Sequence, residues 1–176
     1  MIFEEVDLPG VRRIRPEPHE DERGLFARIF DRERFAEEGL VSDYPQHSLS
    51  FNRERGTLRG MHWQAPPYGE TKLVRCVSGR LWDVVVDLRP ESPTYLDSIG
   101  IELSAANRES LYVPEGFAHG FLTLVSGTEI LYLISEPYRP EAARGARWND
   151  PAFEIEWPHE PRVISDRDDA FPDFQP

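Results

Sequence analysis

The middle of the chain alternates short apolar, β-branched runs with turn-forming residues, and this pattern limits the fold more than any other feature. Residues 72–77 and 81–88 read as two strands joined at Ser78-Gly79, and further strands are predicted at 98–103, 110–113, 120–124 and 129–135. One short helix is predicted at 32–38, where Asp31 can cap it. Many short strands at regular spacing predict an all-β sandwich or jelly-roll barrel with few helices.

The composition narrows the kind of protein. The 176 residues fit a single domain, and the Pro- and Asp-rich tail from Pro158 is expected to lie over it as an extended arm. A net charge of −12 and a pI near 4.9 argue against nucleic acid or anionic membranes as partners. No apolar run is long enough to span a bilayer, and the acidic start differs from a signal peptide. With one cysteine, Cys76, the expected location is the cytoplasm.

A local basic cluster opposes the overall negative charge. It consists of Arg53, Arg55, Arg59, Lys72 and Arg75. The cluster is consistent with a solvated surface or with a site for a small anion, and charge alone does not decide between them. Lys72 is the only lysine in the chain, whereas every other basic side chain is an arginine. A lysine ammonium is a compact point charge, and it can serve a catalytic role at a place where the larger, planar guanidinium of arginine does not fit.

Two spacings approach the motifs of cupin barrels. Gly56, His62, Gln64, Glu70 and Gly79 follow the first motif, and Pro114, Gly116 and His119 follow the second. Metal-binding cupins carry a histidine where this chain has Gln64. Two histidines and Glu70 would make a thin ligand set, so we expect no bound metal.

Several segments in order resemble the dTDP-4-dehydrorhamnose 3,5-epimerase family. They read "RGTLRGMHWQAPPYGETKLVRC", "DVVVDLRPESPTY", "YVPEGFAHGF", "ILYLISEPY" and "RWNDPAFEIEWP", and the resemblance runs from Asp21 to Asp168. It implies a cupin jelly roll that forms a homodimer and needs no cofactor. The implied substrate is a nucleotide-diphospho-4-keto-6-deoxy sugar, inverted at one or both carbons beside the ketone.

The resemblance implies four catalytic residues. His62 matches the base that removes the carbon-bound proton, and Tyr132 matches the acid on the opposite face of the sugar. Lys72 matches the cation that stabilises the enolate. Asp168 matches the carboxylate that orients the histidine, although it also fits a solvated acidic tail, and Asp166 and Asp169 lie close enough to be the aligned residue instead.

Further positions match substrate contacts of the family. Arg59 and Arg23 resemble phosphate-binding arginines, and Arg167 stands where the family has a lysine. Arg23 and Phe26 belong to "DERGLF", a segment that in the family reaches the neighbouring subunit. His119 matches a substrate contact and Tyr138 matches the aromatic that stacks on the base.

The match is weakest for the residues that hold the nucleobase. The family's Gln-x-Asn pair is incomplete: Gln46 is one position out of step and has no paired Asn. Arg28 replaces a family glutamate, and Ala143 stands at an acidic position. Thymidine is therefore in doubt, and single and double inversion stay open. Two alternative functions are a metal-dependent cupin oxygenase or isomerase, disfavoured by Gln64, and a non-catalytic sugar-nucleotide-binding cupin.

Overall fold

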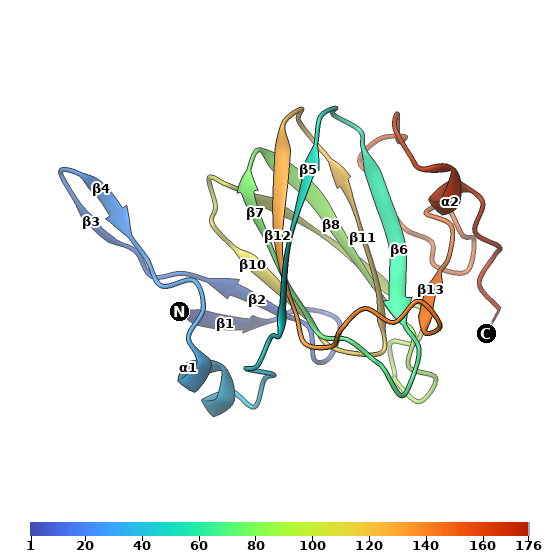
Figure 1. The fold of residues 1–176 in the computed structure, drawn as a ribbon, viewed down its shortest axis with the longest axis horizontal. Helices are drawn as coiled ribbons and strands as arrows, with labels where there is room; N and C mark the ends of the chain where they lie inside the picture. The colour runs from blue at the N-terminus through green and yellow to red at the C-terminus, as the bar shows by residue number, and fades with distance from the viewer. Residues whose placement is uncertain (176) are drawn as a thin grey trace.

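Two antiparallel sheets face each other in the computed structural model, which describes residues 1–175 (Figure 1). One sheet has the strand order β1-β2-β10-β7-β12-β5 and the other has the order β13-β6-β11-β8-β9. The strands of the first sheet are β1 (Ile2–Glu5), β2 (Arg12–Arg15), β5 (Gln46–Asn52), β7 (Lys72–Ser78), β10 (Ser110–Val113) and β12 (Thr128–Ile134). Those of the second are β6 (Leu58–Gln64), β8 (Arg80–Asp87), β9 (Ser98–Ser104), β11 (Phe117–Thr123) and β13 (Ala143–Gly145). This is the predicted sandwich.

The predicted strands agree closely with β7 to β12. β10 has the predicted bounds, β7 and β9 each extend one residue further at the C-terminal end, and β8 and β12 each begin and end one residue earlier than predicted. β11 begins at Phe117 rather than at 120, because Phe117 and Ala118 continue the ladder to β8, opposite Asp87 and Val86. At the turn between β7 and β8, Gly79 has a φ of +74°, and a Cβ there would lie 2.6 Å from the hydroxyl of Thr128. Only glycine fits that turn without strain.

The space between the sheets is filled by inward-facing aliphatic and aromatic side chains. These include Val74, Cys76, Leu81, Val85, Leu103, Leu111, Phe121 and Ile130. Alternate residues of each strand point into this core, as expected for a sandwich with period-two patterning. The end of the sandwich where β6, β7, β11 and β12 carry polar inward-facing residues is not filled in this way, and the site lies there.

A second cluster covers the outer face of the six-stranded sheet. The helix α1 (Arg32–Glu37) begins at Asp31, whose carboxylate accepts hydrogen bonds from the backbone N–H groups of Glu33 and Arg34, as predicted. Phe35 of this helix is fully buried and packs edge-on against Phe3. The helix is six residues long, so packing of this kind, rather than intrinsic helix stability, holds it in place.

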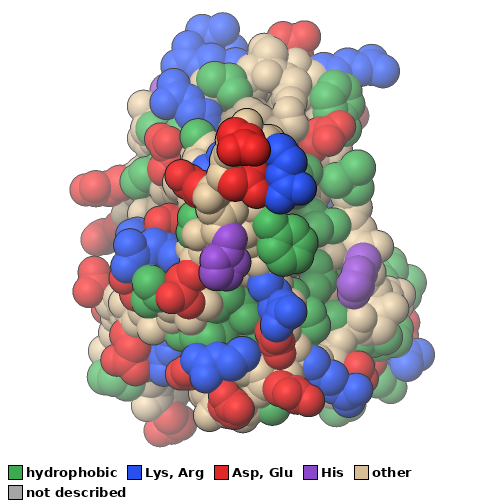
Figure 2. All heavy atoms as spheres, turned by 90° about the vertical axis from the view of Figure 1, so that its left-hand side faces the viewer, with side chains coloured by type: hydrophobic (Ala, Val, Ile, Leu, Met, Phe, Trp, Pro, Cys, Tyr) green, Lys and Arg blue, Asp and Glu red, His purple; other side chains and the backbone are tan. Residues whose placement is uncertain are grey.

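A small hairpin projects from the body on the side away from the C-terminal segment (Figure 1). Its strands are β3 (His19–Asp21) and β4 (Gly24–Phe26), which pair only with each other. Phe26 is 74% exposed, and the Arg23 side chain is paired with Asp21 within the hairpin. Viewed from this side, acidic and basic side chains are interspersed with hydrophobic ones (Figure 2).

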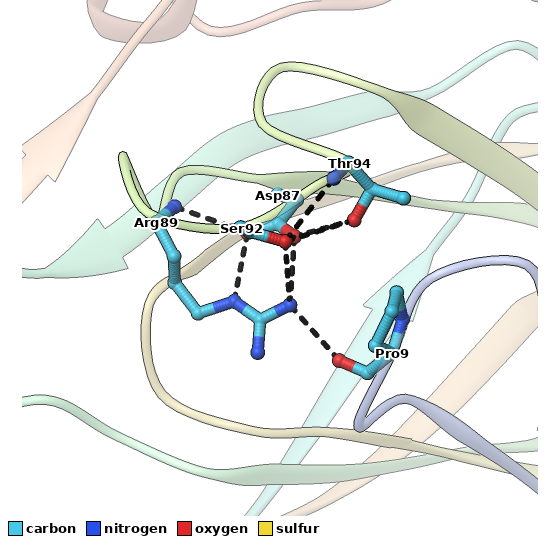
Figure 3. A network of polar contacts seen from close by, with 5 residues as sticks. All are labelled: Pro9, Asp87, Arg89, Ser92 and Thr94. Atoms are coloured by element: carbon cyan, nitrogen blue, oxygen red, sulfur yellow. Dashed lines mark hydrogen bonds and ion pairs between the residues drawn. The ribbon is translucent and has the colours of Figure 1, made fainter.

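The loop between β8 and β9 is organised by one buried carboxylate. Asp87 accepts hydrogen bonds from the backbone N–H and the guanidinium of Arg89 and from the hydroxyls of Ser92 and Thr94, at 2.6 to 3.0 Å (Figure 3). Arg89 also donates to the carbonyl of Pro9, which ties the loop to the N-terminal segment. Burial alone would raise the pKa of Asp87, but these hydrogen bonds outweigh it and lower the pKa to about 2.

The C-terminal segment runs along the five-stranded sheet. Val163 forms a parallel bridge with Thr57, and a short helix, α2 (Asp166–Asp169), follows, capped by Ser165. The helix was not predicted, because four residues are too few to show a helical period. Farther on, the ring of Phe174 packs against Phe153 and Trp63. Within residues 1–175, no helix is long and apolar enough to cross a membrane.

Candidate active site

One cavity between the two sheets collects most of the predicted site residues. It has a volume of about 520 Å³ and is lined by all four candidate catalytic residues: His62, Lys72, Tyr132 and Asp168. Of the predicted binding residues, it is also lined by Gln46, Arg59, His119, Tyr138 and Arg167. Arg23 and Phe26 are the exceptions, since both lie on the exposed β3–β4 hairpin outside this cavity.

The basic cluster seen in the sequence is divided by the fold. Arg59 and Lys72 line the cavity, whereas Arg53 and Arg55 lie in the loop between β5 and β6. Arg75 is buried and donates a hydrogen bond to the hydroxyl of Ser110. Positive charge at the cavity is therefore supplied by two residues of the cluster together with two arginines distant from it in sequence, Arg144 and Arg167.

A histidine–carboxylate pair joins the five-stranded sheet to the C-terminal segment. His62 lies on β6, and its Nε2 is 2.8 Å from Oδ1 of Asp168 on α2. The side chain of Asp168 is 6% exposed, and its second oxygen accepts a hydrogen bond from the backbone N–H of Gly60. Burial opposes ionisation of Asp168, but hydrogen bonding to His62 and the charges of His62 and Arg167 lower its pKa overall. Of the three aspartates considered from the sequence, Asp168 is the one that meets His62.

This arrangement fixes which nitrogen of His62 carries the proton. An ionised carboxylate accepts hydrogen bonds and donates none, so Nε2 must be the protonated nitrogen in the neutral ring. Nδ1 is then the unprotonated, basic nitrogen. The imidazole itself is 38% exposed and borders the cavity. The pair can therefore accept one proton, and Asp168 stabilises the cation that results.

Tyr132 reaches the cavity from the opposite sheet. It lies on β12, with its ring edge-on to His119 at a centroid distance of 6.1 Å. Burial and the nearby carboxylate of Asp83 raise the pKa of the phenol far above its usual value, and Arg59 only partly offsets this rise. The phenol is therefore protonated at neutral pH and can donate a proton.

Lys72 is held at the start of β7, in the same sheet as Tyr132. Its ammonium is 2.9 Å from a carboxylate oxygen of Glu70 and 3.3 Å from the backbone oxygen of His62. Both side chains of the ion pair are about nine-tenths buried. From the sequence, Glu70 was considered only as a metal ligand. In the structure its carboxylate fixes the position of the Lys72 ammonium.

The other potential metal ligands also have protein partners. His119 lies opposite His62 in the β6–β11 ladder, and its Nε2 is 2.8 Å from Oδ1 of the buried Asp83. Gln64 donates to the carbonyl of Tyr68 and accepts from the backbone N–H of Arg139. Within residues 1–175, no group of three or more His, Cys, Asp or Glu side chains is arranged to hold a metal ion.

Two further residues lie at the cavity rim near the expected base-binding end. Tyr138 is 56% exposed, and its backbone N–H donates to the side-chain oxygen of Gln46 at 3.3 Å. Arg144 also lines the cavity, but its guanidinium is turned to the carbonyls of Glu141 and Ala143. Sequence reasoning missed Arg144, which lies between two of the segments that carried the resemblance.

Comparison with known proteins places the chain in a family. The family model for dTDP-4-dehydrorhamnose 3,5-epimerase matches residues 5–176. A protein of that name from Sinorhizobium fredii is 42% identical over 177 residues, covering 98% of this chain and 89% of its own length.

Solved structures of the same family resemble this chain as well. The epimerase of the same name from Elizabethkingia anophelis superimposes with a TM-score of 0.94 at 36% identity, covering 99% of this chain and 96% of that one. A dTDP-6-deoxy-D-glucose-3,5-epimerase from Legionella pneumophila, in complex with dTDP-4-keto-L-rhamnose, gives a TM-score of 0.90 at 31% identity and covers 99% of both chains. These likenesses confirm the expected all-β cupin-type fold, and the chain belongs to the dTDP-4-dehydrorhamnose 3,5-epimerase family.

Proposed function

We propose that the protein epimerises a nucleotide-diphospho-4-keto-6-deoxy sugar, of the kind the family name specifies, at C3, C5 or both. The observation that carries this proposal is the placement of a base and an acid on facing walls of one cavity. His62 with Asp168 belongs to the five-stranded sheet side, and Tyr132 belongs to the six-stranded sheet. Inversion at carbon needs such a pair, because one group must remove a proton and another must return one to the opposite face.

The chemistry follows from the protonation states. Nδ1 of His62 takes the proton from the carbon beside the ketone, and the C–H electron pair forms the enolate, with negative charge on the ketone oxygen. Lys72, whose ammonium is fixed by Glu70, stabilises that oxygen. The enolate then takes the phenol proton of Tyr132 on its other face, which restores the ketone with inverted configuration. The tyrosinate regains a proton and the imidazolium loses one, with solvent balancing the two.

The same cavity suits the rest of the substrate. Arg59 and Arg167 line it and supply guanidinium groups for the diphosphate. Tyr138, exposed at the rim, offers a ring for the nucleobase to stack on, with Gln46 beside it. We assign His119 to sugar contact rather than to proton transfer, because its side chain is 5% exposed, against 38% for that of His62.

We also propose that the protein works as a homodimer in the cytoplasm. Arg23 and Phe26 have no place in the cavity of their own chain, and the hairpin that carries them projects away from the body. A partner subunit whose cavity receives this hairpin accounts for both facts. Cys76 is a free, buried thiol whose pKa burial raises to about 11, which is compatible with a reducing compartment.

Solvent exchange tests the proposed reaction. In D₂O, the purified protein should incorporate deuterium beside the ketone of dTDP-4-keto-6-deoxyglucose without added metal or nicotinamide, and the inverted product should accumulate. Proton NMR of the sugar follows both events. Activity lost to a chelator and restored by a divalent ion would favour the metal-dependent alternative. Binding of the sugar nucleotide without exchange would favour the non-catalytic one.

A further inference from the structure

Phe171, in the C-terminal segment, contacts the proposed base although it takes no part in the chemistry described above. It follows α2 by two residues, and its ring is edge-on to the imidazole of His62, with centroids 5.9 Å apart and planes at 70°. We propose that Phe171 is a positioning residue that sets the orientation of the His62 ring. This inference rests on the proposed function of His62 as the base.

The ring of Phe171 occupies a space that the fold keeps open for it. Gly145 on β13 pairs directly with His62 on β6, so substituents at the two positions emerge on the same side of the sheet. A Cβ built on Gly145 would lie 2.3 Å from Cζ of Phe171 and within 2.7 Å of two neighbouring ring carbons. The absent side chain at Gly145 therefore lets the tip of the phenyl ring sit beside the imidazole.

A second restraint on the imidazole has a physical purpose. The hydrogen bond to Asp168 fixes the position of Nε2, but the ring can still rotate about that contact. Such a rotation would move Nδ1, the nitrogen that takes the substrate proton. A ring packed against the edge of the imidazole restricts this rotation, and displacements on the order of 1 Å are costly to catalysis.

Phe171 also touches a residue proposed to bind the substrate. The guanidinium carbon of Arg167 lies 5.6 Å from the centre of the Phe171 ring, within range of a cation–π contact. Arg167 lines the cavity and flanks Asp168 in the sequence. The phenyl ring thus lies between a group for the diphosphate and the proposed base, so one side chain supports both.

The test compares two aromatic residues of the same segment. Phe171→Leu should lower kcat by about tenfold while KM changes by less than about threefold. Phe174→Leu is the matched control: its ring packs on Phe153 and Trp63, and kcat should stay within about twofold of wild type. Three outcomes would overturn the proposal: an equal fall in kcat in both variants, a change in Phe171→Leu that is confined to KM, or a normal kcat in Phe171→Leu. In each case the ring would serve only to anchor the C-terminal segment.

A second readout needs no substrate and therefore separates this inference from the proposed function. The phenyl ring current should shift the NMR signals of the His62 ring protons, which comparison with His62→Asn identifies. This shift should vanish in Phe171→Leu and persist in Phe174→Leu. Gly145→Ala should displace the ring and reproduce both the lost shift and the lower kcat. A wild-type protein that exchanges no deuterium refutes the proposed function, whereas an unchanged His62 signal in Phe171→Leu refutes the role of Phe171.

Discussion

Replacing Asp168 by asparagine tests the proposed base most directly. The substitution keeps the size of the side chain and leaves an oxygen to accept from the N–H of Gly60. It removes the charge that lies 2.8 Å from Nε2 of His62. The asparagine amide can instead donate to Nε2, which places the imidazole proton on Nδ1. In that tautomer Nδ1 is no longer a base.

The expected magnitude follows from the contact. A hydrogen bond to a charged group contributes about 1.5–3 kcal/mol, which corresponds to a rate loss of about 10- to 100-fold. The wrong tautomer adds to this loss, so we expect kcat to fall by about 10² to 10⁴. KM should change little, because Asp168 stabilises charge that develops on His62 during the reaction rather than the bound substrate.

The assay measures deuterium incorporation and inversion by NMR in the same sample. Both should fall together, since both follow proton removal. Asp166→Asn is the matched control, because Asp166 is exposed on the same short helix and makes no contact with His62. If Asp168→Asn kept more than about a third of wild-type kcat, or if Asp166→Asn lost as much, the assignment of the pair would be wrong.

Three other predictions concern separate parts of the structure. Lys72→Arg should lower kcat by about a hundredfold despite keeping the charge, because a planar fork cannot replace the compact ammonium beside Glu70; near-normal turnover would refute a role in stabilising the enolate. Tyr132→Phe should retain part of the deuterium exchange while inversion falls, and equal loss of both activities would argue against its role as the acid. Asp87→Asn should lower the free energy of unfolding at pH 7 by about 2 kcal/mol, since its pKa is about 2 against an ordinary 3.8. That contribution is complete above pH 4 and is lost as the pH falls toward 2, so urea denaturation should show the variant and the wild type converging in acid.

The strands from β7 to β12 could be predicted because each carries an apolar pattern bounded by turn residues. The helix α1 was predicted, but the strands before β7 were not. The β3–β4 hairpin is short and exposed on all six residues, so no buried face marks it. In β6, Arg59 and Gly60 interrupt the apolar run just before His62.

For the site, resemblance identified residues that composition and pattern could not. Only Lys72 stood out independently, as the single lysine. The ion pair with Glu70 depends on how β7 begins, and the contact between Phe171 and His62 joins positions over a hundred residues apart. Neither leaves a periodic signal in the sequence, because each arises from tertiary packing.

The position of the single lysine in the wall of the cavity also allows selective labelling. Apart from the amino group at the start of the chain, the ε-amine of Lys72 is the single amine that the sequence offers. An amine-reactive reagent therefore has no surface lysines to consume it, and attachment at Lys72 reports entry into the cavity. Mass spectrometry would measure the extent of labelling at Lys72 with and without a sugar nucleotide present. Reduced labelling in its presence would show that the sugar nucleotide occupies the cavity.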